Sequence, residues 1–180
     1  MTVENALRNV TLEIEKHVAK GGWDAPIRLF ALVKAQAALA ANPQLAKELP
    51  ADVQTEAITD PETLFSVEQE QLPEFSTLGE LLGSIIWPPE VDGAAICCER
   101  IVLPPSAEID LPNDEQELEK VLKTHPQRQD VRMVAAVMRD GSTWGAIRMK
   151  EHDHDDMVLS GAQIVEGLTE ALKQTFLEEI

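Results

Sequence analysis

The sequence has no tyrosine, only three tryptophans and four phenylalanines, and no lysine or arginine between Lys47 and Arg100. That same stretch carries many carboxylates, and the formal net charge of the 180 residues is −17. A phosphate backbone is repelled by such a field, and few aromatic rings are present to stack on bases. We therefore expect no direct nucleic-acid partner.

Long apolar runs and a secretion signal are also lacking. Charges or prolines interrupt every apolar run before it reaches bilayer length, and the N-terminus carries Glu4, Glu13 and Glu15. The only cysteines, Cys97 and Cys98, are adjacent in a predicted strand, so their side chains should point to opposite faces and share neither a metal nor a disulfide. The sequence thus predicts a protein of the reducing cytoplasm, with no membrane partner.

Familiar catalytic patterns are missing too. No Gly-x-Ser-x-Gly elbow, phosphate-binding loop or dinucleotide glycine pattern occurs, and the chain has four histidines. His17 falls in a predicted helix and His125 precedes a proline at a helix end, where contacts with terminal carbonyls are the usual role. We therefore expect a non-enzymatic protein without a cofactor.

What is present is a mixture of helical and strand periodicity. Residues 3–20, 35–41, 78–86, 114–124 and a segment from 165 are predicted as helices, and 27–33, 94–103, 131–139 and 142–150 as strands. Ser66 to Gln69 fits a capping box that opens a brief helix. The expected fold is a single α+β domain over residues 1–180, with a four-stranded antiparallel or mixed sheet packed with about five helices. Residues 50–73 are expected to form an acidic, mobile loop within it.

The strongest local signal is a hairpin at Asp140-Gly141, a dipeptide typical of two-residue turns. A two-residue turn pairs Val137 with Trp144 and places Ala136 on the opposite face, against the core.

That register predicts an outward sheet face that mixes apolar and basic side chains, which suits an interface. Its members are Met133, Trp144, Arg148 and Lys150. Three further binding candidates are Trp23 and Trp87 at element ends and Arg100 within an apolar strand. The alternative is that a helix covers this face and that carboxylates pair with its cations. The leading hypothesis is a binding or adaptor domain that docks a protein partner, or forms a homodimer, through this face.

A second hypothesis concerns the acidic segment 151–156, which follows the last predicted strand. On an extended backbone His152, His154 and Asp156 share one side, while Glu151, Asp153 and Asp155 point away. Such a set is the weaker candidate for a metal-binding protein or a small metal-dependent enzyme. The alternative is a solvated acidic turn. A third hypothesis places a small-molecule pocket beneath the loop 50–73.

Short phrases spread along the chain resemble an uncharacterised family of actinobacterial proteins. They lie at 22–26, 29–33, 86–88, 93–95, 99–105, 125–126, 137–141, 154–156 and 165–168. The resemblance implies a small cytoplasmic α+β domain and brings no catalytic or cofactor residues.

Overall fold

The structure, a computed structural model, describes residues 2–104 and 111–176. One antiparallel sheet organises it, with six strands in the order β2-β1-β3-β4-β5-β6. The strands are β1 (Arg28–Lys34), β2 (Leu64–Glu68), β3 (Gly93–Val102), β4 (Gln129–Met138), β5 (Thr143–Met149) and β6 (Leu159–Gly161). The α+β class agrees with the prediction, but the predicted four-stranded sheet was wrong. β6 is too short to show an alternating pattern.

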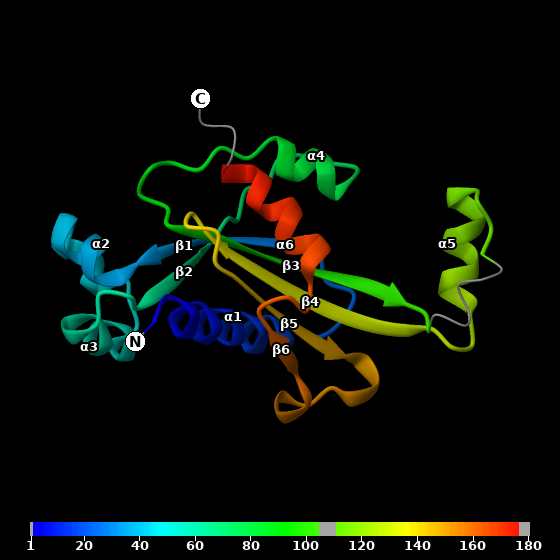
Figure 1. Cartoon of the computed structure of the whole chain (residues 1–180), viewed down its shortest axis with the longest axis horizontal. Helices are drawn as coiled ribbons and strands as arrows, with labels where there is room; N and C mark the ends of the chain where they lie inside the picture. The colour runs from blue at the N-terminus through cyan, green and yellow to red at the C-terminus, as the bar shows by residue number, and fades with distance from the viewer. Residues whose placement is uncertain (1, 105–110, 177–180) are drawn as a thin grey trace.

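Helices cover both faces of this sheet (Figure 1). α1 (Val3–Ala19) lies on one face, and α4 (Leu78–Gly83) and α6 (Glu166–Lys173) lie on the other. α2 (Ala35–Ala41) and α3 (Ala51–Thr59) flank the β1 and β2 side, whereas α5 (Glu115–Thr124) stands at the opposite end of the molecule. The described residues thus hold six α-helices where about five were expected.

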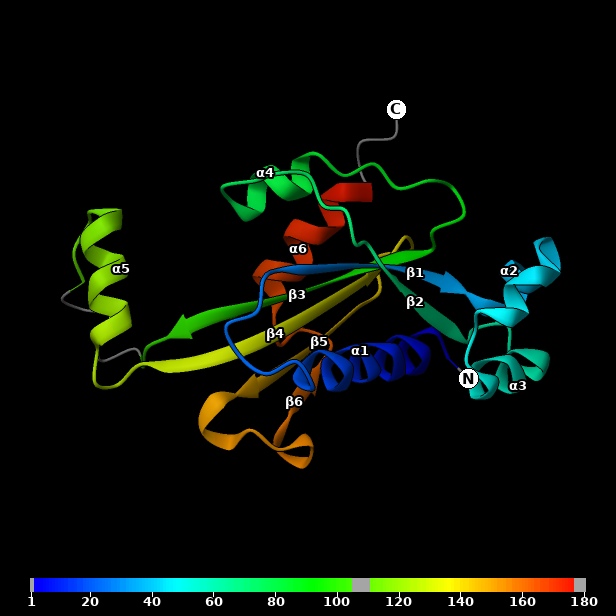
Figure 2. The same cartoon turned by 180° about the vertical axis from the view of Figure 1, so that it is seen from behind.

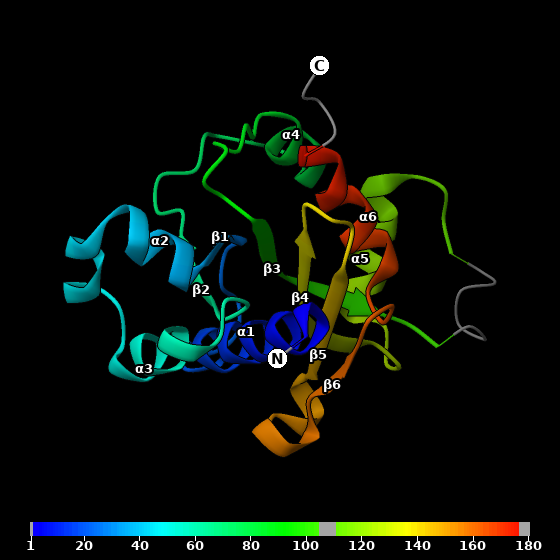
Figure 3. The same cartoon turned by 60° about the vertical axis from the view of Figure 1, so that its left-hand side comes forward.

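Each sheet face has its own apolar core, as Figure 3 shows with the sheet between α1 and the α4–α6 pair. Leu7, Val10 and Ile14 of α1 pack on Phe30 and Cys97 of the sheet. Leu29, Ile96 and Cys98 pack on Leu82, Leu168 and Leu172 on the other side. Cys97 and Cys98 therefore face opposite layers, as their adjacency in a strand predicts.

Residues 50–73 are not the loop that the sequence predicted. They contain α3 and the edge strand β2, which pairs with β1 from Phe30↔Glu68 to Lys34↔Leu64. The capping-box pattern at Ser66 to Gln69 was misleading because Leu64 and Phe65 are buried against the neighbouring layers, which favours a strand. Packing overrode the local helix signal.

The β4–β5 hairpin forms, but its turn has three residues rather than two. Met138 N donates to Ser142 O at 2.9 Å, and Gly141 adopts φ +94° between them. The register is therefore shifted by one residue, so that Ala136 lies opposite Trp144 and Ala135 opposite Gly145. Because side chains alternate along a strand, this shift moves the whole predicted face of β5 to the other side of the sheet.

β5 pairs with β4 as far as Val131↔Met149, so only Gln129 and Asp130 of β4 lie beyond it. We call residues 98–102 and 129–133 the arm; they are the ends of the two longest strands, β3 and β4. Ten residue pairs join them, from Gly93↔Met138 to Val102↔Gln129, whereas β1 pairs with β3 only as far as Cys97. α5 lies at the tip of the arm, apart from α4 and α6 (Figures 1 and 2).

Candidate functional site

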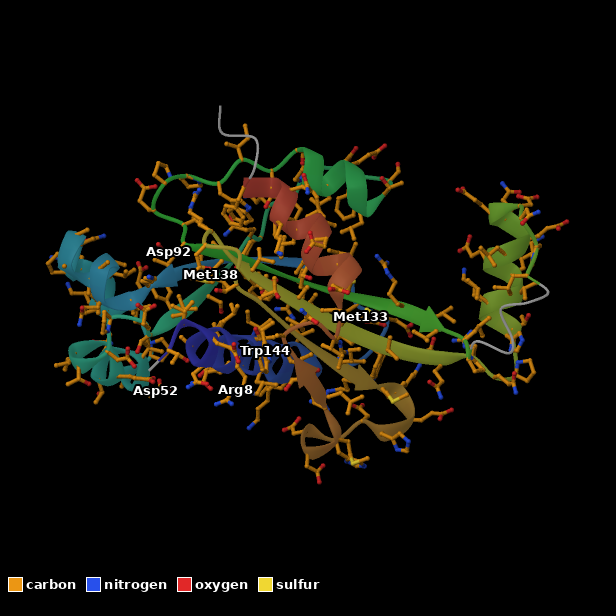
Figure 4. The ribbon with its side chains drawn as sticks, viewed as in Figure 1. Arg8, Asp52, Asp92, Met133, Met138 and Trp144 are labelled. Atoms are coloured by element: carbon orange, nitrogen blue, oxygen red, sulfur yellow. The ribbon has the colours of Figure 1, made fainter. Side chains whose placement is uncertain are left out.

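The predicted interface around Trp144 and Arg148 is covered by α1. Arg148 Nε donates to Glu15 Oε2 at 2.9 Å and its Nη2 donates to Glu15 Oε1 at 2.7 Å. The two side chains are only 3% and 2% exposed. Trp144 is half-buried against α1, and Figure 4 shows it on the α1 side of the sheet while Met133 lies on the α6 side. The prediction that Trp144, Arg148 and Met133 share one open face was therefore wrong, because the register is shifted by one.

Two carboxylates beyond β5 complete the environment of Arg148. Asp153 accepts from Nη1 at 3.0 Å and Asp155 accepts from Nη2 at 2.6 Å. The hydrogen bonds that Arg148 donates to Glu15 are the main cause that raises the pKa of Arg148. The hydrogen bond from the Trp23 indole, followed by Arg148, lowers the pKa of Asp153, and the one from Arg148 lowers that of Asp155. For Arg148 the alternative interpretation of this face is therefore correct. A helix, α1, covers it, and carboxylates pair with its charge.

Trp23 fixes the loop after α1 to the same corner. Its indole nitrogen donates to Asp153 Oδ2 at 3.0 Å, the Arg132 guanidinium lies 4.4 Å above its ring, and the Lys150 ammonium lies 5.9 Å from it. Arg132 is 1% exposed and donates to the carbonyl of Gly22. Trp23 and Lys150 thus belong to a contact that closes the end of the α1 layer over the arm.

Trp87 has an equivalent role on the other face. It is buried, donates from Nε1 to Thr175 Oγ1 at 2.9 Å, and stacks on Phe176 with ring centroids 6.0 Å apart. The ring therefore joins the loop before β3 to the chain after α6.

The segment 151–156 is not extended, so the expected alternation of its side chains does not occur. Two short 3₁₀ helices, Lys150–His152 and Asp155–Met157, replace it. Asp153 and Asp155, which were expected to point away from a metal, instead bind Arg148. Among the residues that the structure describes, no three His, Cys, Asp or Glu side chains are grouped to hold a metal ion.

The remaining two candidates, Arg100 and Met133, lie together in a groove on the α6 side of the arm. The groove has a volume of about 520 Å³; its floor is the arm and one wall is α6. Apolar side chains dominate its lining, among them Val102, Met133, Ile164 and Leu168. Arg100 is exposed there, and Val102 is 36% exposed. We call this hollow the arm groove.

α5, at the tip of the arm, has no buried side chain (Figure 1). Asp114 caps it by accepting from Gln116 N at 3.1 Å. Leu118, Val121 and Leu122 share one side of the helix and are only half-buried. Figures 1 and 2 show α5 separated from α6 by the length of the arm.

The described residues contain no helix that is both long and apolar enough to cross a bilayer.

Comparison with known proteins places the chain in a family. The family model for PPA1309-like proteins matches residues 7–177, so the chain belongs to the PPA1309-like protein family. No curated protein and no solved structure matches it.

Proposed function

We propose that this member of the PPA1309-like family is a protein-binding domain of the actinobacterial cytoplasm that self-associates through the arm groove. The observation that carries the proposal is the pairing of two apolar surfaces in one chain. One is the stripe on α5, and the other is the arm groove, which α5 does not fill in its own chain. A second copy of the chain supplies a groove for the α5 stripe and a stripe for the arm groove.

α5 is too short to be stable without packing against another surface. An isolated helix shorter than about 12–15 residues is marginal in water, because nucleation costs more than a few turns return. α5 has ten residues and none of them is buried. Burial of Leu118, Val121 and Leu122 against an apolar surface would supply the stabilisation that the helix lacks in the single chain.

The arm groove suits this helix in its apolar lining and in one exposed cation. Its lining is apolar around Met133 and Leu168, and Arg100 stands exposed at its floor. The first turn of α5 is acidic, with Glu115 and Glu117. In a two-fold dimer each α5 would enter the groove of the other copy, so the same contact would form twice.

A reducing compartment fits the cysteines of the described fold. Cys97 and Cys98 are both free and buried in opposite layers. Burial, the largest cause, raises the pKa of Cys97 to about 12 and also raises that of Cys98. Thiols of this kind behave as core side chains.

Sedimentation velocity over a concentration series, from about 1 to 100 µM, tests the proposal. A sedimentation coefficient that rises with concentration toward the value of a dimer is expected. A single monomeric species at every concentration would refute self-association.

A further inference from the structure

Strand β2 forms one edge of the sheet. It pairs with β1 on one side, and the pairing continues just past both ends of β2, where Gln69 N donates to Leu29 O at 2.8 Å and Ala35 N donates to Thr63 O at 2.9 Å. With the antiparallel register, these bonds turn the backbone groups of Ser66 and Glu68 outward. Within the described residues no other strand pairs with that edge.

Two hollows run along this edge and share Glu68 and Glu70 in their linings. One, of about 400 Å³, lies between β2 and the chain around Leu49 and Val53. The other, of about 1100 Å³, continues past the end of β2 toward Ile27 and Phe75. Figure 3 shows α3 beside β2 on this side of the molecule. We call the two hollows together the β2 groove.

Carboxylates dominate the polar lining of the β2 groove. They are Glu13, Glu48, Glu68, Glu70, Glu74 and Glu80. The only cation in either lining is Arg28, and it is bound to Glu68 through Nε at 2.8 Å. The apolar part, including Leu49, Val67 and Phe75, lies between these acids, and Val67 is 44% exposed.

The carboxylates crowd one another where the groove meets α1. Partial burial and the neighbouring charges of Asp52 and Glu56 raise the pKa of Glu13. A cation placed beside them would relieve this repulsion.

From these observations we propose that the β2 groove binds an extended, lysine- or arginine-containing segment of a partner protein, which adds a strand to the edge of β2. The outward N–H and C=O groups of Ser66 and Glu68 would pair with the backbone of that segment. Its alternate side chains would then fall on the two sides of the added strand, basic ones toward Glu70 and Glu74 and apolar ones toward Val67 and Phe75.

Fluorescence anisotropy with labelled extended peptides of about ten residues, alternating lysine and valine, tests the proposal. Saturable binding that weakens as salt rises is expected. Glu70→Lys/Glu74→Lys should weaken it by about tenfold or more. Glu90→Lys/Glu151→Lys, which makes the same change of charge at exposed positions outside both hollows, should have a much smaller effect.

Two further arms separate strand addition from simple charge attraction. Methylation of alternate peptide nitrogens removes the donors of one strand edge, and Ser66→Pro removes an outward N–H while sparing the bonds to β1. Each should weaken binding by about tenfold. Equal binding by the methylated peptide or by spermidine, or absence of saturable binding at millimolar peptide, would overturn the proposal. Peptide binding is tested separately from self-association. Val121→Asp changes α5, which lines neither hollow, and should leave peptide binding unchanged.

Discussion

Glu15 of α1 and Arg148 of β5 form a buried ion pair with two hydrogen bonds, of 2.9 and 2.7 Å, between residues 133 positions apart in the chain. The pair joins the helical layer to the sheet at the corner where the arm begins. It also explains why the α1 face of the hairpin is closed.

Removal of one member of this pair should destabilise the fold strongly. In Arg148→Met the carboxylate of Glu15 stays buried without its partner, and the free energy of unfolding should fall by about 3–5 kcal/mol. The double variant Glu15→Leu/Arg148→Met should recover most of that loss, since no buried charge remains. Urea unfolding measures both. A single variant as stable as the wild type would contradict the structure at this corner.

Stability should also depend on pH through Asp153 and Asp155. Their pKa values in the folded state lie below the ordinary value of 3.8. A carboxyl with a lowered folded pKa stabilises the fold above its unfolded pKa, and that contribution is lost as the pH falls through the folded value. Wild-type stability should therefore drop more steeply below about pH 4 than that of Asp153→Asn, measured by urea unfolding at each pH. Parallel curves would show that Asp153 contributes nothing.

Gly145 should not tolerate a side chain. A methyl group there would overlap Val165, which precedes α6 and packs on this point of β5. Gly145→Ala should cost about 1–3 kcal/mol, because the overlap forces α6 away from the sheet. The control is Gly79→Ala in α4, where the nearest atom to the added methyl is Thr77 Oγ1 at 3.9 Å. Thermal unfolding should show a lower midpoint for the first variant alone.

The two cysteines should be protected in the native protein. Burial raises the pKa of Cys97 to about 12, so the thiolate is scarce near pH 8. A disulfide-exchange reagent should react slowly in buffer and rapidly, with both thiols, in denaturant. Fast reaction without denaturant would mean that a layer covering β3 opens readily.

The elements with strong periodicity were predictable from the sequence. α1 has buried Leu7, Val10 and Ile14 at helical spacing, and its predicted range differs from the structure by one residue at its C-terminal end. β2 was missed because Ser66 and Gln69 fit the capping box of a helix. Only its burial against other layers, which is not local information, reveals a strand.

The candidate site was harder to predict, because a turn that is longer by one residue moves every β5 side chain to the other face of the sheet. Asp140-Gly141 suits a two-residue turn and also a three-residue loop in which Gly141 takes positive φ. The structure has the longer loop, so Trp144 faces α1 rather than solvent. Arg100 was a binding candidate because it interrupts an apolar strand, and Met133 because the two-residue turn placed it on an outward face. Their meeting in one groove depends on the position of α6, which no local pattern encodes.

The central claim, that α5 of one copy fills the arm groove of another, allows a complementation test. Val121→Asp alters only the helix surface and Val102→Asp alters only the exposed floor of the groove. Each variant alone should be a folded monomer by circular dichroism and sedimentation. The matched control is Ile58→Asp on α3, an equally apolar side chain that is 77% exposed, which should associate like the wild type.

Sedimentation velocity of the two variants mixed in equal amounts is the most direct measurement. The Val121→Asp chain keeps an intact groove and the Val102→Asp chain keeps an intact helix, so one good contact can form between them. The account predicts a dimer in the mixture that is absent from either variant alone. Wild-type association that survives both substitutions, or a mixture that stays monomeric while the wild type dimerises, would contradict it.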